Sequence, residues 1–272
     1  MPDDAKPKER LPVLLLLHGF AQGKPTGDAS RQQRAIHAWE AEYGITLADE
    51  RLRQPPIERL YPRVLYLKDP RIAEIDAALA ARPFQRLVLV CPVTPIPYFQ
   101  QRTAPLFIEF TNWIGDELLP AVRRLTPASN LKEHSGVAGH SMGGQVALEV
   151  MLRRPDLFTA CMPIQAAIEK RQAYYYAERF KAAFTDRTPA LHIMTSSRDL
   201  YVEANRRLRD HLKSRGFAPA YTEPFGHHAT SFVREVGSLE LLLWMGSQLR
   251  LSKRPEPKLG AFPPGYPLSW TP

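Results

Sequence analysis

The sequence is poor in cysteine and lacks the patterns that hold metal ions. Its 272 residues contain only two cysteines, Cys91 and Cys161, and no Cys-x-x-C pair. We expect both to be buried thiols rather than a disulfide, because each lies at or near an apolar stretch. No His-x-x-x-His pair and no Cys/His cluster occurs, so the sequence indicates no metal site.

Long apolar runs near the amino terminus are also missing. The apolar run at 11–17 follows a highly charged segment at 1–10 and is too short to span a membrane. It ends in His18-Gly19 without a small-residue cleavage site, which does not fit a secretory signal. We therefore expect a cytoplasmic protein with no membrane span.

Positive charge is in excess but is not concentrated. The chain has 36 Lys and Arg against 28 Asp and Glu, a formal net charge of +8, and its arginines are scattered. A nucleic-acid interface favours dense basic runs interleaved with aromatics, and none is present. We expect a basic, solvated surface and no nucleic-acid partner, with a preference for anionic substrates as the alternative.

The length fits one large domain, which buries about three quarters of its extended surface and needs no disulfide to fold. The tail from Lys253 is rich in proline and cannot form a helix or a central strand. We expect it to be disordered, unless its aromatic residues bind it to the body of the protein. The expected parts are a charged extension at 1–10, an α/β domain at 11–250 with an insertion or elaborated crossover at 24–84, and a Pro-rich tail at 251–272.

Apolar runs alternate with amphipathic segments along the chain, which predicts a doubly wound, mostly parallel sheet flanked by helices. The crossover between the first two strands is unusually long, and it either elaborates the fold or caps the site. It holds helical stretches near 29–42 and 70–81 and a short apolar piece at 63–67. The predicted strands are 13–17, 86–91, 135–138, 158–164, 190–194 and 220–223, and the predicted helices between and after them are 106–125, 142–154, 201–215 and 230–250.

The most informative motif is Gly-His-Ser-Met-Gly-Gly at 139–144. An apolar strand precedes it and an amphipathic helix follows, which is the context of a nucleophile elbow. In such an elbow Ser141 adopts a strained backbone, and Gly139 and Gly143 avoid collisions with the neighbouring strand and helix. An ordinary turn is the alternative, but the flanking elements favour Ser141 as a nucleophile.

A serine nucleophile needs a base, and the base needs an orienting acid, each at the carboxyl end of a strand. Asp199 follows the strand at 190–194 and is the predicted acid, although an Asp there could also cap a helix. Two adjacent histidines follow the last strand. We favour His227 as the base, with His228 as the second choice.

The oxyanion of an acyl intermediate requires two N–H donors. One is the backbone N–H of Met142, directly after the nucleophile, and the other is predicted at Phe20, in the loop after the first strand. His18 and His140 lie close to this site in sequence. Their positions indicate packing or supporting groups rather than catalytic ones.

With these residues in place, the chain resembles the α/β-hydrolase superfamily over residues 11–250. Within it, the chain is similar to the putative-esterase branch, which includes esterase D, dienelactone hydrolase and polyhydroxybutyrate-depolymerase-like enzymes. The resemblance implies a cofactor-free hydrolase of esters or thioesters that works through an acyl-enzyme on a small-molecule acyl ester. It rests on His18-Gly19, Gly139–Gly144, the run 154–158, the run 199–202, and Gly226-His227 followed by Phe232.

The chain also departs from this family pattern. Relatives commonly have glycine where Ser196 stands, the usual first strands are reduced or missing, and the segment 24–84 matches no family pattern. Two other functions stay open. One is an acyltransferase or biosynthetic thioesterase with the same triad, and the other is a non-catalytic binding protein of the same fold. The acyl and alcohol groups and the oligomeric state, including a homodimer, are not determined by the sequence.

Overall fold

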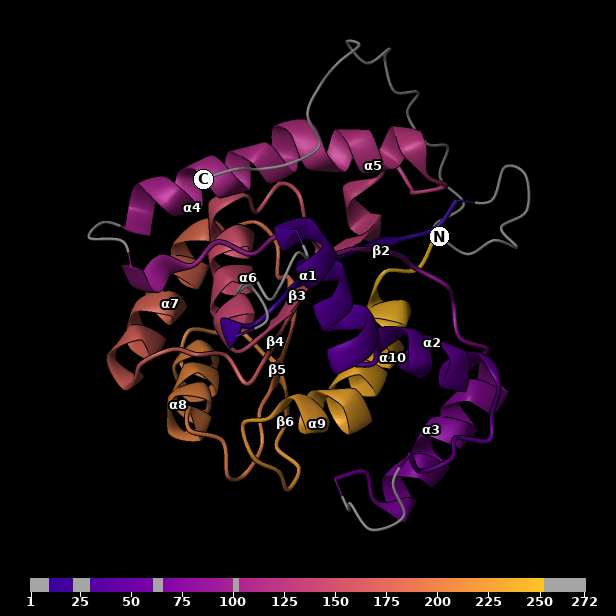
Figure 1. Ribbon diagram of the computed structural model, residues 1–272. Coiled ribbons are helices and arrows are strands. Elements are labelled where there is room, and N and C mark those ends of the chain that lie inside the picture. The colour runs from indigo at the N-terminus through magenta and orange to yellow at the C-terminus, as the bar shows by residue number, and fades with distance from the viewer. Residues whose placement is uncertain (1–9, 22–29, 61–65, 100–102, 252–272) are drawn as a thin grey trace.

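The computed structural model describes residues 10–21, 30–60, 66–99 and 103–251, which form a parallel sheet with helices on both faces (Figure 1). All six predicted strands are present, with β2, β4 and β6 shorter and β3 longer than predicted. The expectations for the charged extension and the Pro-rich tail fall outside the described residues, apart from Arg10 and Leu251. The strands are β1 (Val13–Leu17), β2 (Val88–Val90), β3 (Ser135–His140), β4 (Ala160–Ile164), β5 (Ala190–Met194) and β6 (Ala220–Thr222).

The strand order is β2-β1-β3-β4-β5-β6, and each adjacent pair is parallel. The chain first adds β2 on one side of β1 and then returns to add β3 on the other side. This reversal makes the carboxyl ends of β1 and β3, where Leu17 pairs with Gly139, the topological switch point of the sheet. In open α/β sheets ligands bind at such a point.

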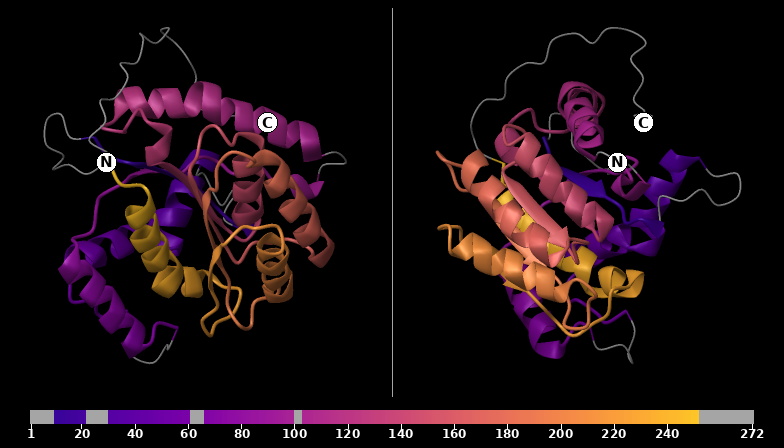
Figure 2. Two further views of the ribbon diagram at one scale, coloured as in Figure 1. Left: turned by 180° about the vertical axis from the view of Figure 1, so that it is seen from behind. Right: turned by 90° about the vertical axis from the view of Figure 1, so that its left-hand side faces the viewer.

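One face of the sheet is covered by the helices of the middle of the chain (Figure 2). The predicted helix at 106–125 is present as two α-helices joined by a π-helical stretch. A helix between β4 and β5 was not predicted, because a run of three tyrosines obscures its helical spacing of buried residues. These elements are α4 (Thr103–Trp113), η4 (Ile114–Leu118), α5 (Leu119–Leu125), α6 (Met142–Arg153), α7 (Lys170–Ala183) and α8 (Val202–Lys213).

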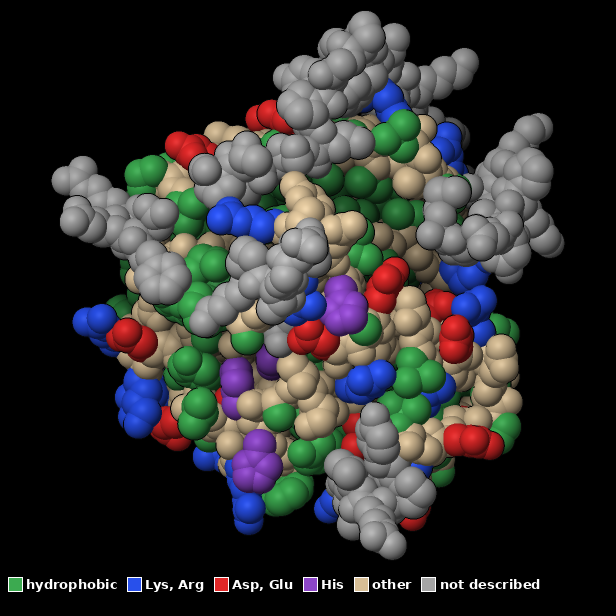
Figure 3. All heavy atoms as spheres, in the orientation of Figure 1, with side chains coloured by type: hydrophobic (Ala, Val, Ile, Leu, Met, Phe, Trp, Pro, Cys, Tyr) green, Lys and Arg blue, Asp and Glu red, His purple; other side chains and the backbone are tan. Residues whose placement is uncertain are grey.

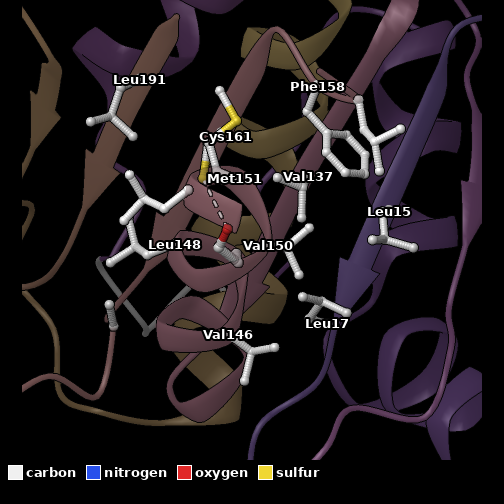
Figure 4. Packing of buried hydrophobic residues seen from close by; sticks show 14 of the residues in the cluster. Leu15, Leu17, Val137, Val146, Leu148, Val150, Met151, Phe158, Cys161 and Leu191 are labelled. Atoms are coloured by element: carbon white, nitrogen blue, oxygen red, sulfur yellow. Dashed lines mark hydrogen bonds between the residues drawn. The ribbon is translucent and has the colours of Figure 1, made fainter. Parts of the chain in front are cut away.

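Helix α6 is the centre of this layer and is buried from Met142 to Leu152. Its valines Val146 and Val150 face Leu17 and Val137 of the sheet (Figure 4). The thiol of Cys161 on β4 lies 3.9 Å from the carbonyl oxygen of Ala147 on the same helix. Burial raises the pKa of this thiol above its ordinary value. Both cysteines are free, and Cys161 is buried as predicted, whereas Cys91 is only partly buried.

The other face is covered by the long crossover after β1 together with the last helices. The crossover helices pack on the sheet, and α2 contacts α10, so this segment contributes to the core. Helix α2 was not predicted, and most of the apolar piece at 63–67 lies outside the described residues. These elements are α1 (Arg31–His37), η2 (Ala38–Glu42), α2 (Ile45–Arg53), α3 (Asp69–Ala81), α9 (Thr230–Phe232), η6 (Val233–Gly237) and α10 (Ser238–Gln248).

None of the helices in the described ranges combines the length and the apolar character that a membrane crossing requires.

Candidate active site

Ser141 stands in a sharp turn between β3 and α6, as the motif predicts. Its φ of 56° and ψ of −118° are rare for a residue with a side chain, and such strain persists only where neighbours enforce it. Its N–H donates to the carbonyl oxygen of Ile164 at 2.9 Å, and its carbonyl oxygen accepts from the N–H of Ala167 at 2.9 Å. Strand β4 and the loop after it therefore hold the turn in place.

The glycines of the motif allow close backbone contacts around this turn. A Cβ on Gly139 would collide with the backbone of Gly143, and a Cβ on Gly143 would collide with the carbonyl group of Leu17. The start of α6 is thus pressed directly against the end of β1. Only glycine permits this approach.

Asp199 lies in the loop after β5, and its carboxylate is fully buried. One oxygen, Oδ2, accepts from the hydroxyl of Thr195 at 2.7 Å. The other, Oδ1, accepts from the N–H of Tyr201 at 3.1 Å and lies 2.7 Å from Nδ1 of His228. Three partners therefore fix the orientation of the carboxylate toward one histidine.

His228 lies between Asp199 and Ser141. Its Nε2 lies 2.9 Å from Oγ of Ser141, on the far side of the ring from the contact with Asp199. The ring packs edge-to-face on Tyr201 at 5.3 Å and stacks on His140 at 5.1 Å. The structure thus places Ser141, His228 and Asp199 in one hydrogen-bonded series.

The sequence favoured His227 as the histidine beside Ser141, and this prediction is wrong. His228, the second choice, contacts both Asp199 and Ser141. The side chain of His227 is exposed, and only its carbonyl oxygen faces the interior, where it accepts from Nε2 of Gln165 at 2.8 Å. Residues 198 and 227 form a parallel bridge, so the backbone here is extended. Consecutive side chains of an extended chain point to opposite sides, and only one of two adjacent histidines can reach Ser141.

The two predicted oxyanion donors lie at the same end of the sheet. Met142 opens α6, so its N–H is among the first four of the helix, which have no intrahelical acceptor. In the loop after β1, the N–H of Gly19 donates to the hydroxyl of Tyr43 at 3.0 Å. The next N–H along the chain is that of Phe20, and it remains the candidate for the second oxyanion donor.

Aromatic side chains border the site. The ring of Phe20 packs edge-to-face on Tyr98 at 5.7 Å, and Tyr98 is half exposed. Next to Asp199 in sequence, the guanidinium of Arg198 lies over the ring of Phe225 at 4.8 Å. Figure 3 shows histidine side chains on this face of the molecule, with hydrophobic, acidic and basic side chains around them.

His18 and His140 are buried supporting groups, as predicted. The Nε2 of His18 accepts from the N–H of Thr94 at 3.0 Å, and the N–H of His18 donates to the hydroxyl of Thr94 at 2.8 Å. Burial is the main cause that lowers the pKa of both histidines, to about 3 for His140, so both imidazoles are neutral. No group of three or more metal-binding side chains occurs in the described part of the chain.

Sequence reasoning missed Tyr43, Thr94, Gln165 and Thr195, all of which contact site residues. Three of them lie outside the motifs, and Tyr43 is 97 positions away from its partner His140. Thr195 alone had a local signal, because it lies four residues before the acid in the same loop.

Comparison with known proteins gives a family match for the middle of the chain, which contains Ser141 and Asp199. Residues 98–213 match the family described as Putative esterase. No curated protein sequence matches the chain.

Several solved structures share the fold. An S-formylglutathione hydrolase from Staphylococcus aureus is 17% identical, with a TM-score of 0.57, and the match covers 88% of this chain and 82% of that one. A ferulic acid esterase is 16% identical, with a TM-score of 0.60 and coverage of 88% and 86%. A feruloyl esterase module from Clostridium thermocellum, complexed with sinapinate, is 16% identical, with a TM-score of 0.54 and coverage of 92% and 83%.

These likenesses show that the chain shares the fold of these proteins. The fold of the chain is thus that of known esterases and hydrolases, and its middle part, residues 98–213, is similar to the Putative esterase family.

Proposed function

We propose that the protein is a serine esterase that cleaves a carboxylic ester or thioester through an acyl-enzyme. The observation that carries this proposal is the hydrogen-bonded series of Ser141, His228 and Asp199, with contacts of 2.9 and 2.7 Å. This series has the order and the roles of a nucleophile, a base and an orienting acid.

Acylation begins when the Oγ of Ser141 attacks the carbonyl carbon of the ester. Nε2 of His228 accepts the serine proton, and Asp199 stabilises the imidazolium that forms. The tetrahedral intermediate then collapses, the bond to the alcohol oxygen breaks, and His228 returns the proton to the leaving alcohol. Water attacks the acyl-enzyme in the same way, and the acid product leaves with Ser141 restored.

The N–H groups of Phe20 and Met142 hold the oxyanion in this proposal. Two features support the pair. Gly143 brings the start of α6 against the end of β1, and the N–H of Gly19 is already bonded to Tyr43. Each such donor contributes roughly 3 kcal/mol to the stability of the transition state.

Replacement of the nucleophile tests the proposal. We expect Ser141→Ala to lower kcat on p-nitrophenyl esters by about 10⁴-fold or more, because no acyl-enzyme can form. A fluorophosphonate should label one serine in the wild type, identified as Ser141 by peptide mapping. The control is Ser129→Ala, which replaces a buried serine that is hydrogen-bonded to His134 outside the site. In this variant Ser141 should still be labelled. A Ser141→Ala protein with wild-type activity would refute the proposal.

The choice between hydrolysis and acyl transfer is tested with the same enzyme. Added alcohols compete with water for the acyl-enzyme, and a hydrolase releases mainly the free acid. A chain-length series from acetyl to octanoyl esters, with methyl ferulate included, then measures the acyl preference. The aromatic rings of Phe20, Tyr98 and Tyr201 near the triad are the reason to include an aromatic acyl group.

A further inference from the structure

A buried polar path connects three loops of the active site that are far apart in sequence. It runs from the loop after β1, through Tyr43, to His140 beside the nucleophile, and on through Gln165 to the loop that carries the base. The side chains of Tyr43, His140 and Gln165 are each at most 4% exposed. The triad itself does not include any of them.

The first half of the path joins the β1 loop to the nucleophile strand. The N–H of Gly19 donates to the hydroxyl of Tyr43 at 3.0 Å, and that hydroxyl lies 3.1 Å from Nδ1 of His140. The Tyr43 ring also packs edge-to-face on the His140 ring at 5.1 Å. Tyr43 therefore lies between the residue before Phe20 and the residue before Ser141.

The second half joins the nucleophile strand to the loop of the base. Nε2 of His140 lies 3.1 Å from Oε1 of Gln165. The amide nitrogen of Gln165 donates to the carbonyl oxygen of His227 at 2.8 Å and to the hydroxyl of Ser196 at 2.6 Å. Ser196 stands where relatives commonly have glycine, so this departure from the family pattern supplies an additional partner for the path.

The carbonyl oxygen of His227 determines the direction of the hydrogen bonds along the path. The carbonyl of His227 can only accept, so Gln165 presents its nitrogen there and its oxygen to His140. His140 must then carry its proton on Nε2 and accept at Nδ1 from the hydroxyl of Tyr43. At the other end the N–H of Gly19 donates to the Tyr43 oxygen, which leaves the hydroxyl proton available for Nδ1 of His140. The Gln165 end thus determines the tautomer, and the Gly19 end is compatible with it.

The protonation states of the buried groups agree with this direction. Burial raises the pKa of the Tyr43 phenol, which therefore keeps its proton. Burial, and then the charge of His228, lower the pKa of His140 to about 3. A neutral His140 matters because its ring is stacked on His228, where a second positive charge would oppose the imidazolium of the catalytic cycle.

We propose that Tyr43, His140 and Gln165 are positioning residues. They hold the loop after β1, the nucleophile and the base at fixed positions relative to one another. The inference rests on the proposed triad, but it assigns a role that the triad does not contain. It also gives a function to part of the crossover at 24–84, since Tyr43 at the end of η2 comes from that segment. Misplacement of reacting groups by about 1 Å can lower the rate about 100-fold.

The test removes one oxygen atom from the path. We expect Tyr43→Phe to lower kcat on p-nitrophenyl acetate by about 10- to 100-fold and to change KM by less than about threefold. Rates are expressed per serine labelled by a fluorophosphonate at the endpoint, which corrects for unfolded protein. Tyr174→Phe, the same change at a half-exposed tyrosine of α7, is the matched control and should match the wild type.

A spectroscopic readout separates positioning from packing. In ¹⁵N-histidine NMR spectra of the wild type, His140 should be the neutral Nε2–H tautomer between pH 5 and pH 7. In Tyr43→Phe, the Nδ1 signal should shift because its donor is gone. As a second variant, His140→Gln retains a donor and an acceptor and should keep more of kcat than His140→Leu does.

The possible failures are distinct. A Tyr43→Phe enzyme with kcat within twofold of the wild type, or a His140 in the Nδ1–H form, would overturn the inference and leave the triad untouched. A wild type in which Ser141 is not labelled would instead overturn the proposed function.

Discussion

At the scale of single residues, the geometry of the site depends on the hydrogen bonds that its buried polar atoms make. The carboxylate of Asp199 has three partners, Thr195, Tyr201 and His228, and no exposed surface. A buried carboxylate left without such partners would cost several kcal/mol, so its orientation is strongly enforced. The ring of His228 is held in turn between this carboxylate and Ser141. The orientation of the His228 ring thus follows from that of the Asp199 carboxylate.

The two adjacent histidines should differ sharply in kinetics. We expect His228→Ala to lower kcat by about 10⁴-fold or more, because Ser141 loses its base. We expect His227→Ala to stay within about threefold of the wild type, because this residue contributes its backbone carbonyl, which alanine retains. Steady-state kinetics on one p-nitrophenyl ester compare the pair, and each variant serves as the control for the other. A larger loss in His227→Ala would contradict the assignment.

At the scale of elements, the site depends on how closely the start of α6 approaches β1. From the motif and its flanking apolar run and helical period, sequence reasoning predicted that Gly139 and Gly143 avoid collisions with a neighbouring strand and helix. It did not identify that strand as β1. It could not predict helix α7, whose buried Ala173, Tyr176, Ala177 and Phe180 have helical spacing but share the segment with exposed tyrosines. Its Arg179 pairs with the buried Glu149 of α6, a contact that only the folded chain reveals.

Two glycines test the close approach of α6 to β1. In Gly143→Ala the new methyl group collides with the carbonyl group of Leu17, which belongs to the backbone and cannot move aside. We therefore expect the free energy of unfolding to fall by about 3 kcal/mol or more. We also expect a loss of activity. Gly216→Ala is the matched control. Its φ of +86° costs alanine about 1 kcal/mol, but no atom lies within 4 Å of the added carbon. Urea unfolding measures both, and equal losses would contradict the contact.

At the scale of the whole molecule, the alternation of apolar runs and helical periods was sufficient to predict the parallel sheet and the order of its strands along the chain. The same reasoning placed Ser141 and Asp199 at strand ends. It could not choose between His227 and His228, because the choice depends on which side of an extended loop faces inward. It could not find Tyr43 either, since that contact joins segments that approach only after folding.

Buried neutral histidines should make the stability of the whole protein depend on pH. Burial is the main cause that lowers the pKa of His140 to about 3 and of His192 to about 4, from an ordinary value of 6.5. The unfolded chain therefore binds more protons than the folded chain below about pH 6.5, and stability falls as the pH falls. Each histidine should remove about 2 kcal/mol of unfolding free energy between pH 7 and pH 5.

Substitution of one of these histidines measures its share of the pH dependence. Few ordinary carboxylates titrate between pH 7 and pH 5, so histidines dominate this window. We expect His192→Gln, whose site lies on β5 away from the triad, to reduce the loss of unfolding free energy across the window by about 2 kcal/mol. His37→Gln, at a side chain that is 53% exposed, is the matched control and should leave the loss unchanged. Urea unfolding at both pH values gives the loss for each variant. An undiminished loss in His192→Gln would mean that burial at this position does not exclude the proton, and that the pH dependence arises elsewhere.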